Sequence, residues 1–143
     1  MKTKTIARHV FALAIMMLPV AVVHADNAGP QNTAPSASAT SGPGIYTNIC
    51  QGCHMADARG ATGAGTIPAL AGDPRLAAAG YPIYVVLYGR GAMPALGSLL
   101  SDAQIAAVLN YVRQDFGNHF PDPVTASEVH AARIPGKDYS GGY

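Results

Sequence analysis

The sequence predicts a small all-α fold of three to four helices, and three stretches of the chain carry this prediction. Apolar residues recur at helical spacing from 105 to 116, after a serine that can cap a helix. A second apolar stretch opens with Pro82, a residue type favoured in the first helical turn, and stops at Gly89. A third helix is expected at residues 44–50, where the apolar residues are Ile45, Tyr46 and Ile49. The foldable domain is therefore placed at residues 43–120.

The first 25 residues are expected to be an export signal peptide. A positively charged start precedes an apolar run at residues 10–23, and compact residues at 23–25 offer a cleavage site. The run of about 14 residues is shorter than the roughly 20 that span a bilayer as a helix. Cleavage after Ala25, which leaves no membrane span, is therefore favoured over a retained membrane anchor. The mature protein is expected in the periplasm.

Removal of the signal peptide changes the charge balance. The whole chain has nine Lys and Arg against eight Asp and Glu, a formal net charge of +1. Without Lys2, Lys4 and Arg8 the count is six against eight, or −2, and Lys137 is the one lysine left. Binding of nucleic acid depends on clustered Lys and Arg. The composition therefore excludes nucleic acid as a partner class.

Two further segments are expected to lie outside the folded domain. Residues 26–42 are rich in small and polar types and hold no large apolar residue, which predicts a flexible leader. Residues 121–143 carry several prolines and are assigned to a C-terminal tail. Each segment is either a contact arm for a partner or solvated disorder. The remaining 80 or so residues are few for a self-supporting core, so an additional stabilising element is expected.

The last helix of the domain has the clearest local signals. Ser101 can cap its start, and Gln104 three positions later completes a capping-box pattern. Gly117 and Asn118 are expected to end it. The buried face is expected to consist of Ile105, Val108, Leu109, Val112 and Phe116.

The segments before this helix are less regular. The helix opened by Pro82 has the apolar residues Ile83, Val85, Val86, Leu87 and Tyr88. A short helical turn is expected at residues 74–79, while the Gly- and Ala-rich stretch 59–72 indicates mainly loop. We also expect Tyr111 of the last helix to face Gly42 or Gly44 where the last and first helices cross closely.

The strongest motif is CQGCH, in which Cys50, Cys53 and His54 lie within five residues. A thioredoxin-type redox pair would follow a core strand, and the preceding GPGIYTNI is not such an entry. A zinc site would need two more ligands, and the remaining donors, His119 and His130, are far apart. A disulfide and a metal site stay alternatives. The C-x-x-C-H order is the signature of covalent haem attachment, which we favour.

The spacing of the motif has a physical reason. A turn of helix places Cys50 and Cys53 so that both thiols reach the two vinyl groups of one porphyrin, and His54 then projects onto the iron as its proximal ligand. One covalently attached haem c is therefore predicted. Because the porphyrin contributes a large apolar surface, it also supplies the core that so short a domain lacks.

The second axial ligand of the iron is predicted by elimination. Met1, Met16 and Met17 leave with the signal peptide, so Met55 and Met93 remain. Met55 directly follows His54 and is held on the proximal face. Met93 lies in the glycine-rich stretch YGRGAMPALG, which is typical of a loop, and Pro94 fixes the backbone after it. Met93 is therefore preferred as ligand over His119 and His130, which are expected to be exposed.

These residues resemble the class I monohaem c-type cytochromes. The resemblance covers roughly residues 42–118 and rests on CQGCH, IPAL, GRGAMPALG and the final amphipathic helix. It implies a small cytochrome c fold, with three to four helices wrapped around one haem. It also implies that the Pro68 carbonyl accepts a hydrogen bond from His54, which would orient the ring. By the same resemblance Leu70, Tyr81 and Leu87 line the haem pocket, and Arg90 neighbours a propionate.

A narrower resemblance concerns the stretch GAMPALGSLLSDAQIAAVLNYVRQDFGN and the PVTASEV that follows. It is similar to cytochrome c domains and subunits that serve bacterial periplasmic dehydrogenases for alcohols, sugars or sugar acids. The resemblance implies a dehydrogenase as electron donor. A terminal oxidase or another cytochrome is then expected as acceptor in the respiratory chain.

Two axial ligands, His54 and Met93, leave the iron no open position for a substrate. Methionine favours ferrous iron and raises the reduction potential. The expected function is therefore one-electron transfer between Fe(II) and Fe(III), with no catalytic residue. One alternative is a haem-relay subunit permanently bound to a dehydrogenase complex. A less favoured alternative is a haem enzyme or gas sensor in which the methionine leaves the iron.

Overall fold

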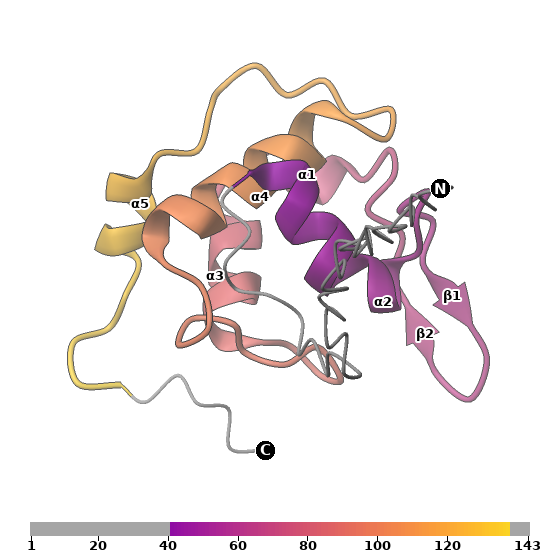
Figure 1. The fold of residues 1–143 in the computed structure, drawn as a ribbon, viewed down its shortest axis with the longest axis horizontal. Helices are drawn as coiled ribbons and strands as arrows, with labels where there is room; N and C mark the ends of the chain where they lie inside the picture. Colours follow the sequence, from indigo (N-terminus) through magenta and orange to yellow (C-terminus); the bar gives the residue numbers. More distant parts are fainter. Residues whose placement is uncertain (1–40, 138–143) are drawn as a thin grey trace, which may run out of the picture. The chain divides into compact units, whose positions relative to one another are not determined.

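The computed structural model describes residues 41–137 (Figure 1). The signal peptide expected at 1–25, the leader up to residue 40 and the end of the tail at 138–143 lie outside the described residues. The described part is mostly helical, as predicted. Among the described residues, no helix is both long enough and apolar enough to cross a membrane.

The chain begins with three helical pieces that follow one another without a break. They are α1 (Gly42–Ile45), the π-helical turn η1 (Tyr46–Cys50) and α2 (Gln51–His54). Ser41 caps the start, because its hydroxyl accepts a hydrogen bond from the Gly44 N–H at 3.3 Å. The Gln51 N–H bonds to the Tyr46 carbonyl, five residues back, which is the spacing that defines a π turn. The expected helix at 44–50 is therefore longer than predicted and reaches the end of CQGCH.

A short hairpin follows this helical stretch. Strands β1 (Ala61–Thr62) and β2 (Thr66–Ile67) pair antiparallel, with Ala61 opposite Ile67. The prediction of mainly loop at 59–72 missed this pair. A 3₁₀ turn, η2 (Pro74–Leu76), then falls within the helical turn expected at 74–79. Asp73 caps it by accepting a hydrogen bond from the Arg75 N–H at 3.0 Å.

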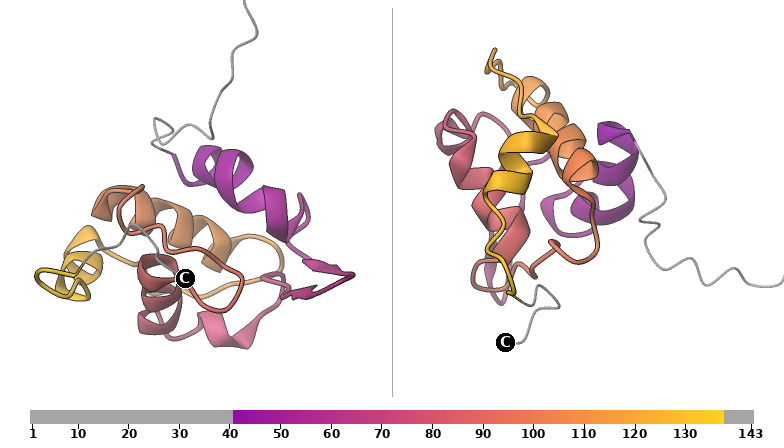
Figure 2. Two further views of the ribbon diagram at one scale, coloured as in Figure 1. Left: turned by 90° about the horizontal axis from the view of Figure 1, so that it is seen from below. Right: turned by 90° about the vertical axis from the view of Figure 1, so that its left-hand side faces the viewer.

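Two longer helices, α3 (Gly80–Tyr88) and α4 (Asp102–Gln114), form the centre of the fold. We expected α3 to begin at Pro82, but it begins two residues earlier, at Gly80. Both hydrogen bonds of the predicted capping box are present at the start of α4, between Ser101 and Gln104. In the views of Figure 2, α4 lies between α1 and α3 and contacts both.

The predicted buried face of α4 is largely confirmed. Four of its expected residues are buried, namely Ile105, Val108, Leu109 and Val112. The helix ends at Gln114, so Phe116 lies beyond it with a positive φ of 57° and is half-buried. Its ring still packs on the rings of Tyr46 and Tyr111, at centroid distances of 4.9 and 5.3 Å.

The crossing of α1 and α4 depends on the absence of a side chain at Gly42. A Cβ atom at this position would lie 2.3 Å from the Ala107 carbonyl oxygen and 2.8 Å from Cβ of Tyr111. Only glycine lets the two backbones approach this closely. The expected close crossing at Tyr111 is thus confirmed, with Gly42 as the partner.

The segment that we assigned to a tail contains a fifth α-helix, α5 (Ala126–Ala131), which packs on α4. Thr125 and Glu128 form a capping box at its start. Val129 is fully buried, and the segment before α5 is fixed by a reciprocal pair of hydrogen bonds between Asn110 and the backbone of Val124, at 2.8 and 2.7 Å. The packed structure therefore extends well beyond residue 120.

A buried arginine joins this C-terminal segment to the rest of the fold. Arg113 on α4 is 2 % exposed. Its guanidinium donates to the carbonyl oxygens of Leu76 at 2.9 Å and Ala77 at 3.1 Å, and to that of Asp122. Arg113 thereby pairs the backbone carbonyl of the buried Leu76 and joins it to Ala77 and Asp122.

Candidate functional site

His54 lies at the end of α2 and is held by the segment after the hairpin. Its side chain is buried, and its ring nitrogen Nδ1 lies 3.0 Å from the Pro68 carbonyl oxygen. A carbonyl oxygen only accepts, so Nδ1 carries the proton and donates it. In the neutral ring this leaves the lone pair on Nε2, which is the form that ligates a metal. This is the hydrogen bond that the resemblance implied for Pro68.

The turn after His54 brings Pro68 into position. The His54 carbonyl accepts a hydrogen bond from the Gly60 N–H at 3.1 Å, and the Ala58 carbonyl accepts from the N–H groups of Leu70 and Ala71 at 2.7 and 3.0 Å. Tyr46 fixes the beginning of this turn, because its hydroxyl donates to the Met55 carbonyl at 2.7 Å. The chain before the hairpin and the chain after it are thereby tied together beside the imidazole.

Both cysteines of CQGCH are free thiols. Cys50 ends η1 and Cys53 belongs to α2, so the two lie three residues apart on a continuous helical stretch, where side chains share one face. Cys50 is half-buried, and burial is the main reason that the pKa of its thiol is raised to about 11. Cys53 is exposed. Neither thiol is consumed by a disulfide, so both remain for attachment of a group.

Met93 lies in a tight turn between α3 and α4. The Arg90 N–H donates to the Met93 carbonyl at 3.0 Å, and the Met93 N–H donates to the Arg90 carbonyl at 3.1 Å. Gly89, with a φ of 73°, allows the turn, since a Cβ atom there would lie 2.6 Å from the Met93 carbonyl oxygen. Further along, the Leu96 N–H donates to the Val86 carbonyl at 2.8 Å. The loop is thus a defined structure rather than an open connection.

The expected pocket residues differ in their surroundings. Leu87 is fully buried in the core. Cys50, Leu70 and Met93 pack against that same core while each keeps part of its surface exposed. The attachment residue Cys50 and the expected ligand Met93 therefore border one apolar region.

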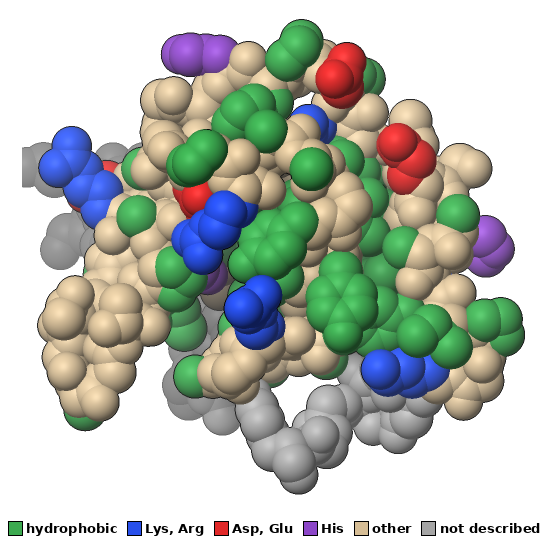
Figure 3. All heavy atoms as spheres, turned by 180° about the vertical axis from the view of Figure 1, so that it is seen from behind, with side chains coloured by type: hydrophobic (Ala, Val, Ile, Leu, Met, Phe, Trp, Pro, Cys, Tyr) green, Lys and Arg blue, Asp and Glu red, His purple; other side chains and the backbone are tan. Residues whose placement is uncertain are grey.

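Arg90 and Tyr81 lie together at the surface. The Arg90 guanidinium carbon is 5.9 Å from the centre of the half-buried Tyr81 ring. Arg75, which sequence reasoning did not single out, also interacts with Tyr81 and forms an ion pair with Asp73 at 2.9 Å. Figure 3 shows several Lys or Arg side chains beside hydrophobic side chains on the face opposite to that of Figure 1.

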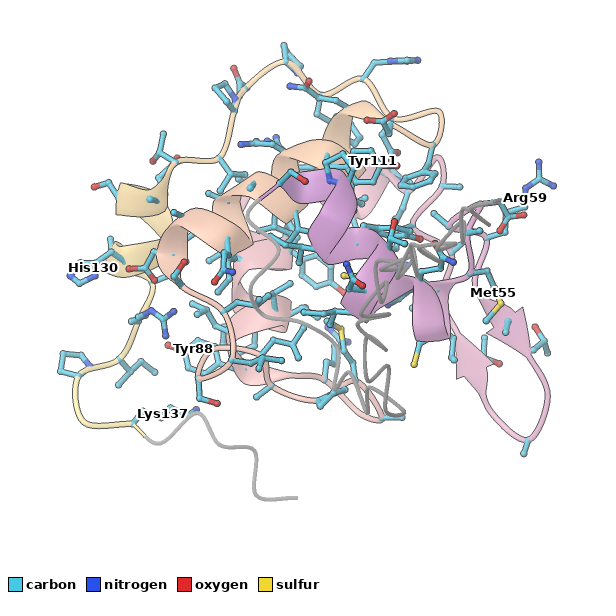
Figure 4. The ribbon with its side chains drawn as sticks, in the orientation of Figure 1. Met55, Arg59, Tyr88, Tyr111, His130 and Lys137 are labelled. Atoms are coloured by element: carbon cyan, nitrogen blue, oxygen red, sulfur yellow. The ribbon has the colours of Figure 1, made fainter. Side chains whose placement is uncertain are left out.

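The competing ligands are placed unfavourably. Met55 is 37 % exposed, and Figure 4 shows it beside the β1–β2 hairpin, on the outer side of the helices. His119 and His130 are exposed, as expected. His130 is engaged elsewhere, because its Nδ1 lies 3.1 Å from an Asp102 carboxylate oxygen.

The side chains present fit a covalently attached haem. Two free thiols on one helical face, an imidazole with its Nδ1 proton already directed at a carbonyl, and a thioether on a fixed loop form the donor set of such a group. Within the described residues, no cluster of three or more His, Cys, Asp or Glu side chains offers an alternative metal site. The zinc alternative therefore has no support there.

Comparison with known proteins agrees with this donor set. A family model described as cytochrome c oxidase, cbb3-type, subunit III matches residues 37–112, just over half of the chain. The gluconate 2-dehydrogenase cytochrome c subunit of Pantoea cypripedii is 34 % identical over 108 residues, which cover 64 % of this chain and 24 % of that subunit.

Two cytochrome c subunits of quinone alcohol dehydrogenases are similar as well. The subunit of Gluconobacter oxydans is 31 % identical over 112 residues, covering 69 % of this chain and 23 % of the relative. The subunit of Gluconacetobacter polyoxogenes is 32 % identical over 124 residues, which cover 76 % of this chain and 26 % of that subunit. The chain therefore spans about a quarter of the length of these curated relatives.

Proposed function

Because this chain belongs to the cytochrome c family whose cbb3-type subunit III model it matches, we propose that it is a periplasmic one-electron carrier with a single haem c of cytochrome c fold. The observation that carries the proposal is the hydrogen bond from His54 Nδ1 to the Pro68 carbonyl at 3.0 Å. It leaves the lone pair of Nε2 available to ligate a metal and raises the basicity of that nitrogen.

Each residue of the site has a distinct role in this proposal. Cys50 and Cys53 would hold the haem covalently, and His54 and Met93 would ligate its iron. When bound, the haem supplies an iron that alternates between Fe(II) and Fe(III). The thioether of Met93 favours the ferrous form, and the apolar surroundings of Leu70 and Leu87 disfavour the additional charge of the ferric form. No residue of the site is assigned a catalytic role.

Electron exchange is proposed to take place near the exposed Cys53. Met55 is exposed close to it in the sequence, and the nearby Arg59 is paired with Asp57 at 3.6 Å. A cluster of lysines of the kind that steers docking is missing from the described residues around the motif. We therefore propose a brief, largely apolar contact with the partner.

The proposed donor is a dehydrogenase, and the proposed acceptor is a terminal oxidase or another cytochrome. The support for the donor is that the relatives are cytochrome c subunits of gluconate and alcohol dehydrogenases. The same observation favours a second candidate, a relay subunit permanently bound to a dehydrogenase. Co-purification of a dehydrogenase in stoichiometric amount would support the second candidate, whereas a free protein that is reduced on mixing would support the first.

The proposed boundaries of the chain follow from the export step. Residues 1–25 are the signal peptide and a leader follows. Because Ser41 caps α1 and Gly42 packs on α4, we place the start of the cytochrome domain at residue 41 rather than 43. Because α5 packs on α4, we place the end of the domain beyond α5 rather than at residue 120. Mass spectrometry of the exported protein tests the first boundary by the mass of its N-terminal peptide.

Absorption spectroscopy of the ferric holoprotein tests the ligand set. Sulfur ligation gives ferric haem a weak near-infrared band, which we expect in the wild type. We expect Met93→Ala to abolish this band and Met55→Ala, the matched control, to retain it. A wild type that lacks the band and binds carbon monoxide readily when reduced would contradict the carrier and favour a haem enzyme or gas sensor with labile methionine ligation.

A further inference from the structure

Residues 132–134, directly after α5, contact the chain on both sides of the Met93 loop. At the start of the loop, the Tyr88 hydroxyl donates to the Ala132 carbonyl at 2.7 Å and accepts from the Ile134 N–H at 3.0 Å. One phenol oxygen therefore fixes the backbone of this segment on both sides of Arg133. Figure 4 shows Tyr88, His130 and Lys137 on the same side of the molecule.

Arg133 completes the contact at the other end of the loop. Its Nη1 donates to the Gly97 carbonyl at 2.7 Å and its Nη2 to the Leu100 carbonyl at 3.2 Å. Its Nε donates to an Asp102 carboxylate oxygen at 2.6 Å, an ion pair at the start of α4. Two nitrogens of the guanidinium thus hold the stretch between Met93 and α4, and the third binds the first residue of α4.

The segment that carries Arg133 is held in place by contacts outside the Met93 loop. Val129 of α5 is fully buried, and Asn110 on α4 binds the backbone of Val124 through two hydrogen bonds. Asp102 is held by His130 as well as by Arg133. The segment that carries Arg133 therefore has anchors of its own and does not depend on the loop for its place.

The Met93 loop is held by two kinds of hydrogen bond. Those between Leu96 and Val86 and between Arg90 and Met93 join the loop to α3 or to itself. The contacts from Tyr88 and Arg133 instead join its two ends to a segment more than 30 residues away. A charged donor on two carbonyls makes stronger hydrogen bonds than a neutral one. A displacement of the whole loop, with Met93 in it, would therefore strain or break these bonds.

We infer that Arg133 is a positioning residue that keeps the Met93 sulfur in place as the second axial ligand, acting through Gly97 and Leu100. This inference rests on the proposed ligation by Met93. It assigns to the C-terminal segment a part in the redox site, although no side chain of residues 124–137 belongs to the expected donor set.

The test measures how readily a small external ligand displaces Met93 in the ferric holoprotein. Imidazole is titrated in, and the loss of the near-infrared band gives its apparent affinity. Because this affinity scales with the fraction of protein in which the methionine is detached, weaker positioning raises it. For Arg133→Gln we expect the apparent affinity to rise about tenfold, as for the loss of one hydrogen bond to a charged group.

Two further variants distinguish positioning from general destabilisation. Arg133→Lys keeps the charge but not the planar fork, so we expect an imidazole affinity between those of Arg133→Gln and the wild type. Arg59→Gln removes an equal charge from an exposed side chain, which Figure 4 shows on the side of the molecule opposite Tyr88 and His130. We expect its imidazole affinity and band to match those of the wild type.

The outcomes separate the two proposals. A wild type without the band overturns Met93 ligation and with it this inference. A wild type with the band, together with an Arg133→Gln variant whose imidazole affinity is unchanged, overturns the inference alone. If Arg133→Gln fails to yield holoprotein, Arg133→Lys replaces it, because it removes the planar fork that binds Gly97 and Leu100 and keeps the charge. An unchanged imidazole affinity in that variant likewise overturns the inference.

Discussion

Tyr46 connects the first helical stretch to the turn that follows His54. Its side chain is almost fully buried, with the ring against those of Tyr111 and Phe116 and the hydroxyl on the Met55 carbonyl. Met55 has a positive φ of 66°, a conformation that a residue with a side chain adopts only when its surroundings impose it. The Tyr46 hydrogen bond is one of the contacts that impose it.

The ionisation of Tyr46 predicts a loss of stability in alkali. Burial is the main reason that the pKa of its phenol is raised to about 12, and a Cys50 thiolate adds to this only in the haem-free chain. The unfolded chain ionises near the usual value of about 10, so stability is complete below that pH and declines as the pH rises toward 12. We expect Tyr46→Phe to be less stable by about 1 kcal/mol at pH 7, because one hydrogen bond is lost.

Urea unfolding of the wild type and of Tyr46→Phe, at pH 7 and at pH 11, measures both the lost hydrogen bond and the loss of stability in alkali. The wild type should lose more stability between these two conditions than Tyr46→Phe, since the variant has no phenol at this position. Equal losses in the two proteins would show that another group controls the alkaline transition.

At the scale of single residues, the predictions succeeded where one short stretch of sequence contains the information. CQGCH predicts a helical stretch that carries two thiols and an imidazole, and η1 and α2 contain all three residues. Arg113 and Arg133 were not predicted, because their partners are backbone carbonyls that only the folded chain brings near. A carbonyl leaves no mark in the sequence, so nothing in the residue types distinguishes these arginines from exposed ones.

At the scale of helices, the crossing of α1 and α4 determines how closely the attachment helix lies to the core. A Cβ atom at position 42 would overlap the Ala107 carbonyl oxygen, and neither backbone can yield without a shift of a whole helix. The stretch that begins at Gly42 continues without a break to Cys50 and His54. A displacement at the crossing is therefore transmitted to the proposed site.

Substitution at this crossing has a clear expected result. We expect Gly42→Ala to lower the free energy of unfolding of the holoprotein by about 2 kcal/mol, the typical cost of overpacking. Gly80→Ala is the matched control, because a Cβ atom at Gly80 would have no heavy atom within 4 Å. The control should change stability by less than about 1 kcal/mol. Similar urea midpoints for the two variants would mean that the helices separate more easily than the structure implies.

The success of element prediction also depended on how local the signals are. The Ser101–Gln104 capping box and the apolar stripe predict α4 correctly because both are contained in one helix. The hairpin was missed because strands of two residues are too short to show alternation. Helix α5 was missed although Thr125 and Glu128 form a capping-box pattern, because nearby prolines made the segment look unstructured.

At the scale of the whole molecule, the apolar core is small and borders the proposed haem site. Cys50, Leu70 and Met93 each lie partly on the core and partly exposed. A haem in contact with these side chains would remove that apolar surface from water, which stabilises the fold in proportion to the area buried. The group is therefore expected to act as part of the core and not only as the redox centre.

Removal of the attachment points tests this expectation. In the double variant Cys50→Ala/Cys53→Ala, the haem is no longer held covalently, and we expect the thermal midpoint to fall by at least about 10 °C, as for a loss of several kcal/mol in a domain of this size. Circular dichroism of the helices measures the midpoint. Wild-type protein produced without haem is the control and should melt like the variant. Equal midpoints for the holoprotein and both haem-free proteins would refute a structural role for the haem.

The contact of Arg133 with Gly97 and Leu100 also has a consequence for biosynthesis. Ribosomes build the chain from its N-terminus, and about 80 residues separate Cys53 from Arg133. At roughly 5–20 residues per second, the cysteines are complete roughly 4–16 seconds before Arg133 exists. Met93 follows Cys53 by about 40 residues and precedes Arg133 by about 40, so the newly made Met93 loop still lacks the bonds that join its two ends to residues 132–134. The attachment motif is thus synthesised first, and Arg133, which binds the end of the Met93 loop, is synthesised last.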